Sequence, residues 1–421
     1  MKLNRNLTLM SIAIFFSVIG SFLLTIAFSV NVYSKTGSAF QASLLFLTQW
    51  LPNIFLAIFG GGISDRIKPS RLSPVLDCIA GVLTLSFLWV LDISSFGSLL
   101  ILMCLRGFVT QMMISVRAVA IKAFFDPGET ASMGSWVQTS YYVAFGLAGL
   151  IGASLIEHIS LSALVWIDSI TFFISAVLFY FTKELSHYQG ESQKEIFIKN
   201  PFRDLSNAWM KTVAHKRIFE SVGLVVLVAA FFQGSYTIIQ TVLPIDVFHM
   251  GATGVSLYFG ICSLGVISGT MVYQRLMKTK FFTLSDHHNN TRTRYIQVLV
   301  LLFMPVGLYI IVGYTKIFWI NAIAYFFFAL FFEVVWLKKQ MQIIKESPQE
   351  HVGKIMGLKN GFGFALMAFI NVITGKLLGV LQIGDTITLL MLFYVLGCLA
   401  VLFVSHMYVP MPKTVMCQNK S

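Results

Sequence analysis

Four charged residues interrupt long apolar stretches of this sequence: Asp77, Arg106, Asp168 and Glu333. An unpaired charge at the centre of a bilayer costs about 3 kcal/mol or more, so such a side chain faces a partner or a wet cavity. A carboxylate that is partly removed from water can also take up and release a proton. The four residues are therefore candidates for proton transfer or for ion pairs within a helical bundle.

Arg106 shares a helical face with Thr110 and Arg117, which favours a position in a cavity. A structural ion pair is the alternative for Arg106. Asp77 and Asp168 could pair with a buried arginine, which favours a role in fixing the bundle over binding a solute.

Glu333 lies in a stretch that Lys338 and Lys339 follow closely. It is either a proton carrier or half of an ion pair near the membrane surface. Lys376 lies near the end of its apolar stretch, and we expect its ammonium group to extend to the surface.

The sequence contains no phosphate-binding G-x-x-x-x-G-K-[ST], no G-x-S-x-G and no H-E-x-x-H motif. Its five cysteines include no C-x-x-C pair, and the pair His287-His288 lacks further ligands at metal spacing. We expect neither an enzyme nor an ATP-driven pump, and neither a metal nor a cofactor.

The composition indicates a membrane protein. Of 421 residues, 57% are hydrophobic and 11% are charged, whereas a soluble domain carries about 25% charged residues. The net charge of +12 could indicate a nucleic-acid partner. The basic residues are dispersed along the chain and form no single patch, so we expect the lipid bilayer as partner and no nucleic acid.

Twelve runs are long and apolar enough to cross a hydrocarbon core about 30 Å thick, which needs roughly 20 residues per helix. We place these helices at 8–33, 38–63, 73–92, 97–121, 131–156, 161–182, 220–246, 253–275, 295–315, 317–338, 354–380 and 386–408. The long hydrophilic segment from Lys183 to Arg217 divides them. We expect an all-α membrane protein of two pseudo-symmetric six-helix bundles, residues 1–183 and 219–408, with a cytoplasmic linker at 184–218 and a tail at 409–421.

An N-terminus in the cytosol puts most of the 30 basic residues on the cytoplasmic side, including Arg117 and Lys122. The positive-inside rule therefore predicts a multi-pass protein of the cell (inner) membrane with both termini in the cytosol. Helix-capping patterns at Asp126–Glu129 and Ser347–Glu350 precede the fifth and eleventh helices, which indicates a duplicated six-helix unit.

The loop between the second and third helices reads GGGISDRIKPSR, from Gly60 to Arg71. Its Gly61, Asp65 and Arg66, followed by the basic Lys68 and Arg71, resemble the signature loop of the major facilitator superfamily of secondary transporters. The resemblance implies two halves that rock about a central site, and a loop that stabilises the state closed to the cytosol. An ordinary positively charged loop is the alternative.

Further passages are similar to the drug-exporter branch of that superfamily, which includes macrolide-efflux and enterobactin-exporter proteins. They are Val30–Ala39, Asp77, Arg106-Gly107, Trp166–Phe172 and Leu257–Gly260. In related exporters an arginine in the helix of Arg106 is implicated in proton coupling. The resemblance thus implies proton-coupled export by alternating access.

In this fold the first, second, fourth and fifth helices of each half border the cavity. Their uncharged polar and aromatic residues could bind a bulky amphipathic solute, or could serve as hydrogen-bonding groups between helices. These candidates are Gln49, Trp50, Asn53, Thr110, Gln138, Tyr142, Gln233, Tyr236, Gln240, Asn321 and Asn371. Gly146, Gly149 and Gly152, three residues apart, predict close approach of a neighbouring helix.

We therefore expect a monomeric secondary transporter that exports an amphipathic small molecule, a drug or a siderophore-like metabolite, against a flow of protons. Import of a siderophore complex, a nutrient or a lysolipid by the same fold is the nearest alternative. A membrane sensor that transports nothing is the alternative from another class.

Overall fold

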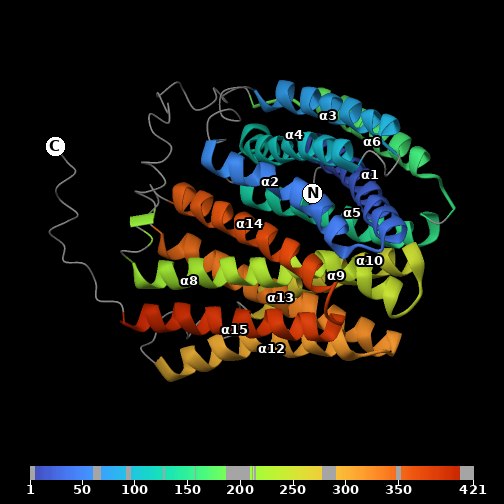
Figure 1. The fold of residues 1–421 in the computed structure, drawn as a ribbon. Coiled ribbons are helices and arrows are strands. Elements are labelled where there is room, and N and C mark those ends of the chain that lie inside the picture. The colour runs from blue at the N-terminus through green and yellow to red at the C-terminus, as the bar shows by residue number, and fades with distance from the viewer. Residues whose placement is uncertain are drawn as a thin grey trace.

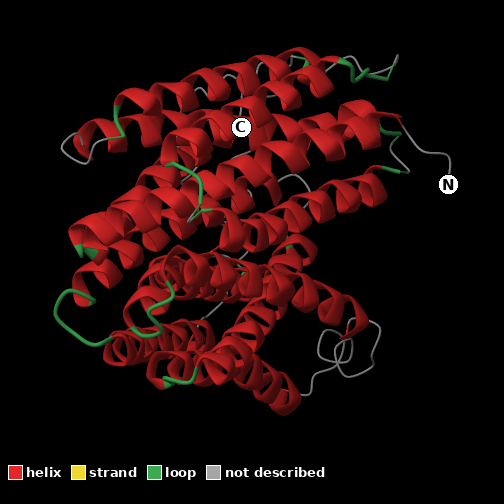
Figure 2. Cartoon of the chain, turned by 90° about the vertical axis from the view of Figure 1, so that its right-hand side faces the viewer, coloured by secondary structure: helices red, strands yellow, loops and turns green. Residues whose placement is uncertain are grey.

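The computed structural model describes residues 5–59, 68–91, 96–126, 129–156, 158–185, 209–210, 212, 215–276, 291–347 and 352–407. Throughout these residues the regular structure is helical, with no strand (Figure 2). The predicted all-α class is confirmed.

Six helical segments form the N-terminal half. They are α1 (Arg5–Thr36), α2 (Ala39–Phe59), α3 (Pro69–Leu85) with a 3-10 turn η2 (Ser86–Trp89), α4 (Phe96–Phe124), α5 (Thr130–Leu155) and α6 (Leu161–Tyr180). Each one coincides with a predicted apolar run to within a few residues.

Six further segments form the C-terminal half. The first is continuous through α8 (Lys216–Val228), a π-helical turn η4 (Ala229–Gln233) and α9 (Gly234–Asp246). It is followed by α10 (Gly251–Leu276), α12 (Thr291–Tyr314), α13 (Phe318–Glu346), α14 (Val352–Leu377) and α15 (Ile383–Met407).

Helix α13 is longer than predicted, because it continues beyond residue 338 to Glu346. Lys339, where the apolar run was expected to have ended, is 4% exposed and pairs with Glu220 of α8. A buried partner therefore lets the helix continue within the bundle past a charge that a hydropathy criterion treats as an end.

The predicted cap of the fifth helix is also different. Helix α5 begins at Thr130, and its N-cap residue Glu129 makes no side-chain capping bond. The Glu129 amide instead donates to the Asp126 carbonyl at 2.9 Å, in a turn that precedes the helix. Residues 127–128 and 348–351 lie outside the described residues.

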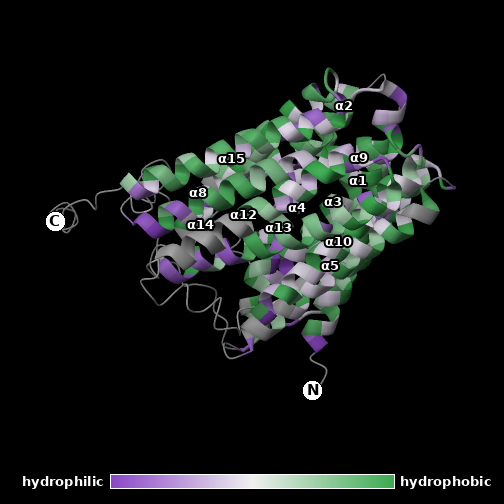
Figure 3. Ribbon diagram, turned by 90° about the horizontal axis from the view of Figure 1, so that it is seen from below, coloured by the Kyte–Doolittle hydropathy of each residue, from purple (hydrophilic) through white to green (hydrophobic). Residues whose placement is uncertain are grey.

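The surface of the bundle is apolar. Nine helices in the described part of the chain are long and apolar enough to cross a membrane. Figure 3 shows hydrophobic residues along the length of the helices and hydrophilic residues mainly toward their ends. Large side chains such as Val177, Trp319 and Phe403 are more than half exposed, which is typical of a surface in contact with lipid. The protein is an integral, multi-pass membrane protein.

The packing of the helices shows that the two halves are related by a pseudo-twofold axis. When the six segments of each half are matched in chain order, α2 corresponds to α10 and α5 corresponds to α14. The α2–α14 contact then corresponds to the α5–α10 contact, and these are the two extensive contacts between the described parts of the halves (Figure 1). The same exchange converts α2–α4 into α10–α13, and α3–α4 into α12–α13. Two pseudo-symmetric six-helix bundles are therefore confirmed.

Small residues allow these close contacts. A Cβ atom on Gly149 of α5 would lie 2.8 Å from the Cα atom of Gly260 on α10, and one on Gly152 would lie 2.8 Å from the Ser256 hydroxyl. The predicted close approach at the glycine stripe of α5 is confirmed, and α10 is the neighbour.

Candidate functional site

A cavity of about 410 Å³ lies between the two halves. Side chains from α1, α2, α4, α5 and α6 line it on one side, and side chains from η4, α9, α10 and α13 line it on the other. The predicted candidates in its wall are Gln49, Trp50, Arg106, Thr110, Tyr142, Gln233, Tyr236, Gln240 and Glu333.

One end of this cavity, which we call the closed end, is sealed by contacts between the halves. The Tyr33 hydroxyl of α1 donates a 2.6 Å hydrogen bond to Asp246 Oδ2 at the end of α9. About one turn farther into the bundle along α1 and α9, the hydroxyls of Ser29 and Thr241 are 3.5 Å apart. The exposed Lys376 ammonium lies 5.5 Å from the centre of the Phe40 ring, between α14 and α2.

Toward the opposite end, the open end, the cavity wall continues through Ile114, Arg117, Glu333 and Trp336. Over the described residues, α4 and α13 border the cavity without packing extensively against each other. Within the described residues, the two halves therefore meet at the closed end and lie apart between α4 and α13 at the open end.

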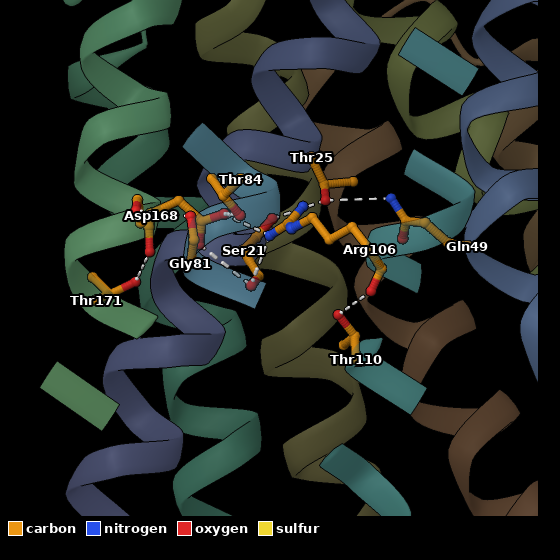
Figure 4. Close-up of polar contacts among 10 residues, drawn as sticks. Ser21, Thr25, Gln49, Gly81, Thr84, Arg106, Thr110, Asp168 and Thr171 are labelled. Atoms are coloured by element: carbon orange, nitrogen blue, oxygen red, sulfur yellow. Dashed lines mark hydrogen bonds and ion pairs between the residues drawn. The ribbon is translucent and has the colours of Figure 1, made fainter. Parts of the chain in front are cut away.

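Arg106 forms a buried ion pair with Asp168 of α6, and the network around the pair is drawn in Figure 4. The same guanidinium nitrogen donates to the Ser21 hydroxyl of α1 at 3.0 Å. The hydroxyls of Ser21 and Thr84 donate in turn to the two Asp168 oxygens. Arg106 is 5% exposed and Asp168 fully buried, so the pair fixes α4 to α1, α3 and α6.

Arg117, almost three turns farther along α4, repeats this arrangement. Its guanidinium donates to Asp77 Oδ1 of α3 at 2.9 Å and to the Ser17 hydroxyl of α1 at 3.2 Å. Ser175 of α6 donates to the second Asp77 oxygen at 3.1 Å. Its side chain is only 11% exposed, because Asp77 holds it within the bundle.

Glu333 is the counterpart of these arginines on the C-terminal side of the cavity. It is 5% exposed, and within the described part of the chain it accepts a hydrogen bond from the Thr270 hydroxyl of α10 at 3.4 Å. Among the described residues no basic side chain forms a salt bridge with it. Lys339, one of the two expected partners, pairs with Glu220 instead.

Three predicted candidates lie away from the cavity wall. The Asn321 side chain accepts from the Tyr258 hydroxyl and donates to the carbonyls of Val312 and Thr315. The Asn371 amide donates to the Gly234 carbonyl and the Thr237 hydroxyl, both at 2.9 Å. Asn53 is half-buried on α2 and does not line the cavity. The side chain of Gln138 lies outside the described residues.

Most of the predicted signature loop, including Gly61, Asp65 and Arg66, also lies outside the described residues. Lys68 and Arg71 are exposed at the start of α3. Lys68 lies 3.7 Å from Glu184, which follows α6. Glu184 also accepts from the backbone amide and hydroxyl of Ser70, so it caps the first turn of α3.

Helix α1 contributes polar residues that are not among the predicted candidates. Ser17, Ser21, Thr25 and Ser29 are spaced four residues apart on one face. Each contacts a partner on another helix: Arg117, Arg106, Gln49 and Thr241, respectively. This spacing was the available signal. Other unpredicted residues of the wall are Gln111, Tyr141, Thr237, Cys262 and Trp336.

The described residues contain no cluster of three or more His, Cys, Asp or Glu side chains that could hold a metal ion. The four cysteines among them, Cys78, Cys104, Cys262 and Cys398, are free thiols.

This architecture of two related six-helix halves around a central cavity is typical of secondary transporters. The family model of the Major Facilitator Superfamily matches residues 10–370. The chain belongs to the major facilitator superfamily, and it is a membrane transporter of the alternating-access type. No curated protein matches it in sequence.

Solved structures with the same fold include transporters of different kinds. A bacterial homologue of the human lysosomal transporter Spinster, inward-facing and unoccupied, is 12% identical with a TM-score of 0.69, over 98% of this chain and 100% of that one. The nucleoside transporter NupG is 12% identical with a TM-score of 0.69, over 97% and 100%. The human organic anion transporter MFSD10 is 14% identical with a TM-score of 0.66, over 95% and 100%. The resemblance to the drug-exporter branch remains a prediction.

Proposed function

We propose that this transporter exports an amphipathic small molecule through the central cavity in exchange for protons. The observation that carries the proposal is the wall itself, where aromatic and uncharged polar side chains surround a space of about 410 Å³. Pockets of a few hundred Å³ with apolar walls and few polar groups are typical of sites for drug-sized solutes.

With both termini in the cytosol, as the distribution of basic residues predicts, the Tyr33–Asp246 end faces outward. In that orientation the open end would face the cytosol. An exported solute would enter between α4 and α13 and leave after the halves had rocked apart at the closed end. The loop from Asp65 to Arg71 would stabilise the opposite state by closing the cytosolic end.

Glu333 is the candidate proton carrier. A carboxylate can alternate between a protonated and an ionised form if no fixed cation holds it ionised. Among the residues that the structure describes, Glu333 accepts a hydrogen bond from Thr270 and forms no salt bridge. Arg106 and Arg117 are each held by an aspartate, so we assign them a positioning role in α4. We propose that the working unit is a monomer in the cell (inner) membrane.

The second candidate function is import through the same cavity. The nucleoside transporter among the solved structures of this fold favours a nutrient as cargo. The direction of gradient-driven movement separates the two functions.

The test is flux in inverted vesicles with an imposed pH gradient, using a cationic, a neutral and an anionic fluorescent amphipath. We expect gradient-driven accumulation of at least one of them by the wild type, and its loss in Glu333→Gln. Asp385→Asn is the matched control, because Asp385 is a carboxylate bonded to Tyr314 outside the cavity wall. Accumulation that persists when the proton gradient is collapsed would contradict proton coupling.

A further inference from the structure

We infer that the cavity selects a lipophilic organic cation and that Glu333 is the group that recognises its charge. This inference rests on the proposed function and names the class of its cargo. Three observations carry it: the charges in the wall, the surroundings of Glu333 and the aromatic rings beside it.

Three of the described residues that line the cavity carry a full charge: Arg106, Arg117 and Glu333. Each arginine forms an ion pair with an aspartate behind the wall, and each also donates to a serine of α1. The Nε atoms of both guanidinium groups are buried. These cations are therefore balanced, and they offer little to an anionic solute.

The charge of Glu333, in contrast, is not balanced within the described residues. Its side chain lies in the wall, accepts one hydrogen bond from Thr270 and forms no salt bridge there. An ionised carboxylate with so few partners is unfavourable in a site of low polarity. A cation that enters the cavity would remove this cost, whereas an anion would increase it.

Aromatic rings adjoin this carboxylate in the wall. Phe332 and Trp336 lie on α13 beside Glu333. Their rings are stacked, with the ring centres 6.3 Å apart and an angle of 27° between the ring planes. Tyr236 of α9 meets the Phe332 ring edge-on at 6.2 Å. Faces of such rings attract cations, most strongly where water is excluded. A carboxylate among aromatic rings is thus suited to a charged nitrogen or phosphorus atom that carries apolar groups.

The Trp336 ring already contacts an ammonium group within the protein. Lys359 of α14 lies 4.8 Å from the centre of the Trp336 ring and donates to Gln340. Lys359 is 3% exposed and is not part of the cavity wall. Phe332 stacks on both Phe328 and Trp336. Tyr236, which also lines the cavity, is therefore the ring of this group that is available to a cation.

Tetraphenylphosphonium and tetraphenylborate test the inference directly, because they have nearly the same shape and opposite charge. Saturable binding of each is measured with the full chain in nanodiscs of uncharged phosphatidylcholine. We expect saturable binding of the cation by the wild type and a loss of about 10- to 100-fold in affinity in Glu333→Gln. Glu333→Asp, which keeps the charge, should retain most of the affinity, and Asp385→Asn should match the wild type.

Tetraphenylborate should show no saturable binding. Equal binding of the two ions, or unchanged affinity for the cation in a correctly folded Glu333→Gln protein, would overturn the inference. Elution as a single monodisperse peak shows that the variant is folded, and the Glu333→Asp protein provides the comparison if Glu333→Gln is not. Binding that depends on Glu333, together with no gradient-driven flux in vesicles, would contradict the proposed export and leave the assignment of charge standing.

Discussion

The two halves of this transporter stabilise their interiors with different chemistry. In the N-terminal half, the long helix α4 carries two arginines, each paired with an aspartate on a peripheral helix. The hydroxyls of α1 complete both networks. Both arginines of this half that border the cavity are therefore held in ion pairs.

In the C-terminal half, neutral groups make the corresponding contacts. The Tyr258 hydroxyl donates to Asn321, and the Tyr325 hydroxyl donates to Gln240 at 3.0 Å. Tyr309 stacks on Phe328 with ring centres 4.4 Å apart. The buried ion pair described in this half, Lys339–Glu220, lies outside the cavity wall.

This difference gives the two halves of a pseudo-symmetric fold different roles: the N-terminal half holds its helices in place, and the C-terminal half is suited to respond to a solute. A buried ion pair resists rearrangement, because losing either partner leaves an unpaired charge. Hydroxyl, amide and ring contacts are individually weaker and can be exchanged at lower cost. The N-terminal wall is accordingly a fixed surface, and the C-terminal wall contains Glu333, whose charge is not balanced within the described residues.

The largest effect that tests this comparison is expected for Asp168→Asn. The change leaves the Arg106 guanidinium buried without its counter-charge, which costs about 3–5 kcal/mol of stability. Thermal unfolding of the solubilised protein measures the loss. The double variant Arg106→Met, Asp168→Leu removes both charges and should recover most of it. A single variant as stable as the wild type would show that the pair does not support the half.

An effect of about 1–3 kcal/mol is expected for Tyr258→Phe in the other half, because the change leaves the buried Asn321 oxygen without its donor. The same unfolding measurement compares the two halves directly. Tyr180→Phe, which alters a largely exposed tyrosine, is the control and should have little effect. A loss as large as that of Asp168→Asn would contradict the distinction between the halves.

The sequence was sufficient for the scaffold, because a bilayer imposes length and apolarity on every crossing helix. It was not sufficient for the site, since the side of a helix that faces the cavity depends on how the helix is rotated against its neighbours. Gln233, Tyr236 and Gln240 line the cavity as their spacing suggested. Asn371, equally polar and on an expected cavity helix, bonds to the backbone of α9 instead.

The sequence indicated that Asp77 and Asp168 could pair with a buried arginine, but it did not show which arginine each would bind. Arg117 and Asp77 are 40 residues apart in the chain, and their contact depends on the packing of α3 against α4. Glu333 could have paired with Lys339 one and a half turns away, but α8 supplies Glu220 to that lysine. Local spacing cannot show which of two available partners the tertiary structure brings closer.

The smallest effect concerns the contact between the halves at the closed end. Tyr33→Phe removes the 2.6 Å hydrogen bond to Asp246 and keeps the ring. A hydrogen bond to a charged group contributes about 1.5–3 kcal/mol when it is well shielded and less when it is near water, as here, where Asp246 is exposed. We therefore expect a shift of about 1 kcal/mol toward the state that is open at the Tyr33 end, or roughly fivefold in population.

The distance between the halves at this end is measured with spin labels at Lys35→Cys and Val380→Cys, in a protein whose native cysteines are replaced. Both positions are exposed, and they lie on different halves. The longer distance should gain population in Tyr33→Phe. Tyr314→Phe is the matched control, because it removes a tyrosine–aspartate bond of 2.8 Å to Asp385 within the C-terminal half alone. An equal shift in both variants would mean that general loosening, and not release of a contact between the halves, moves the equilibrium.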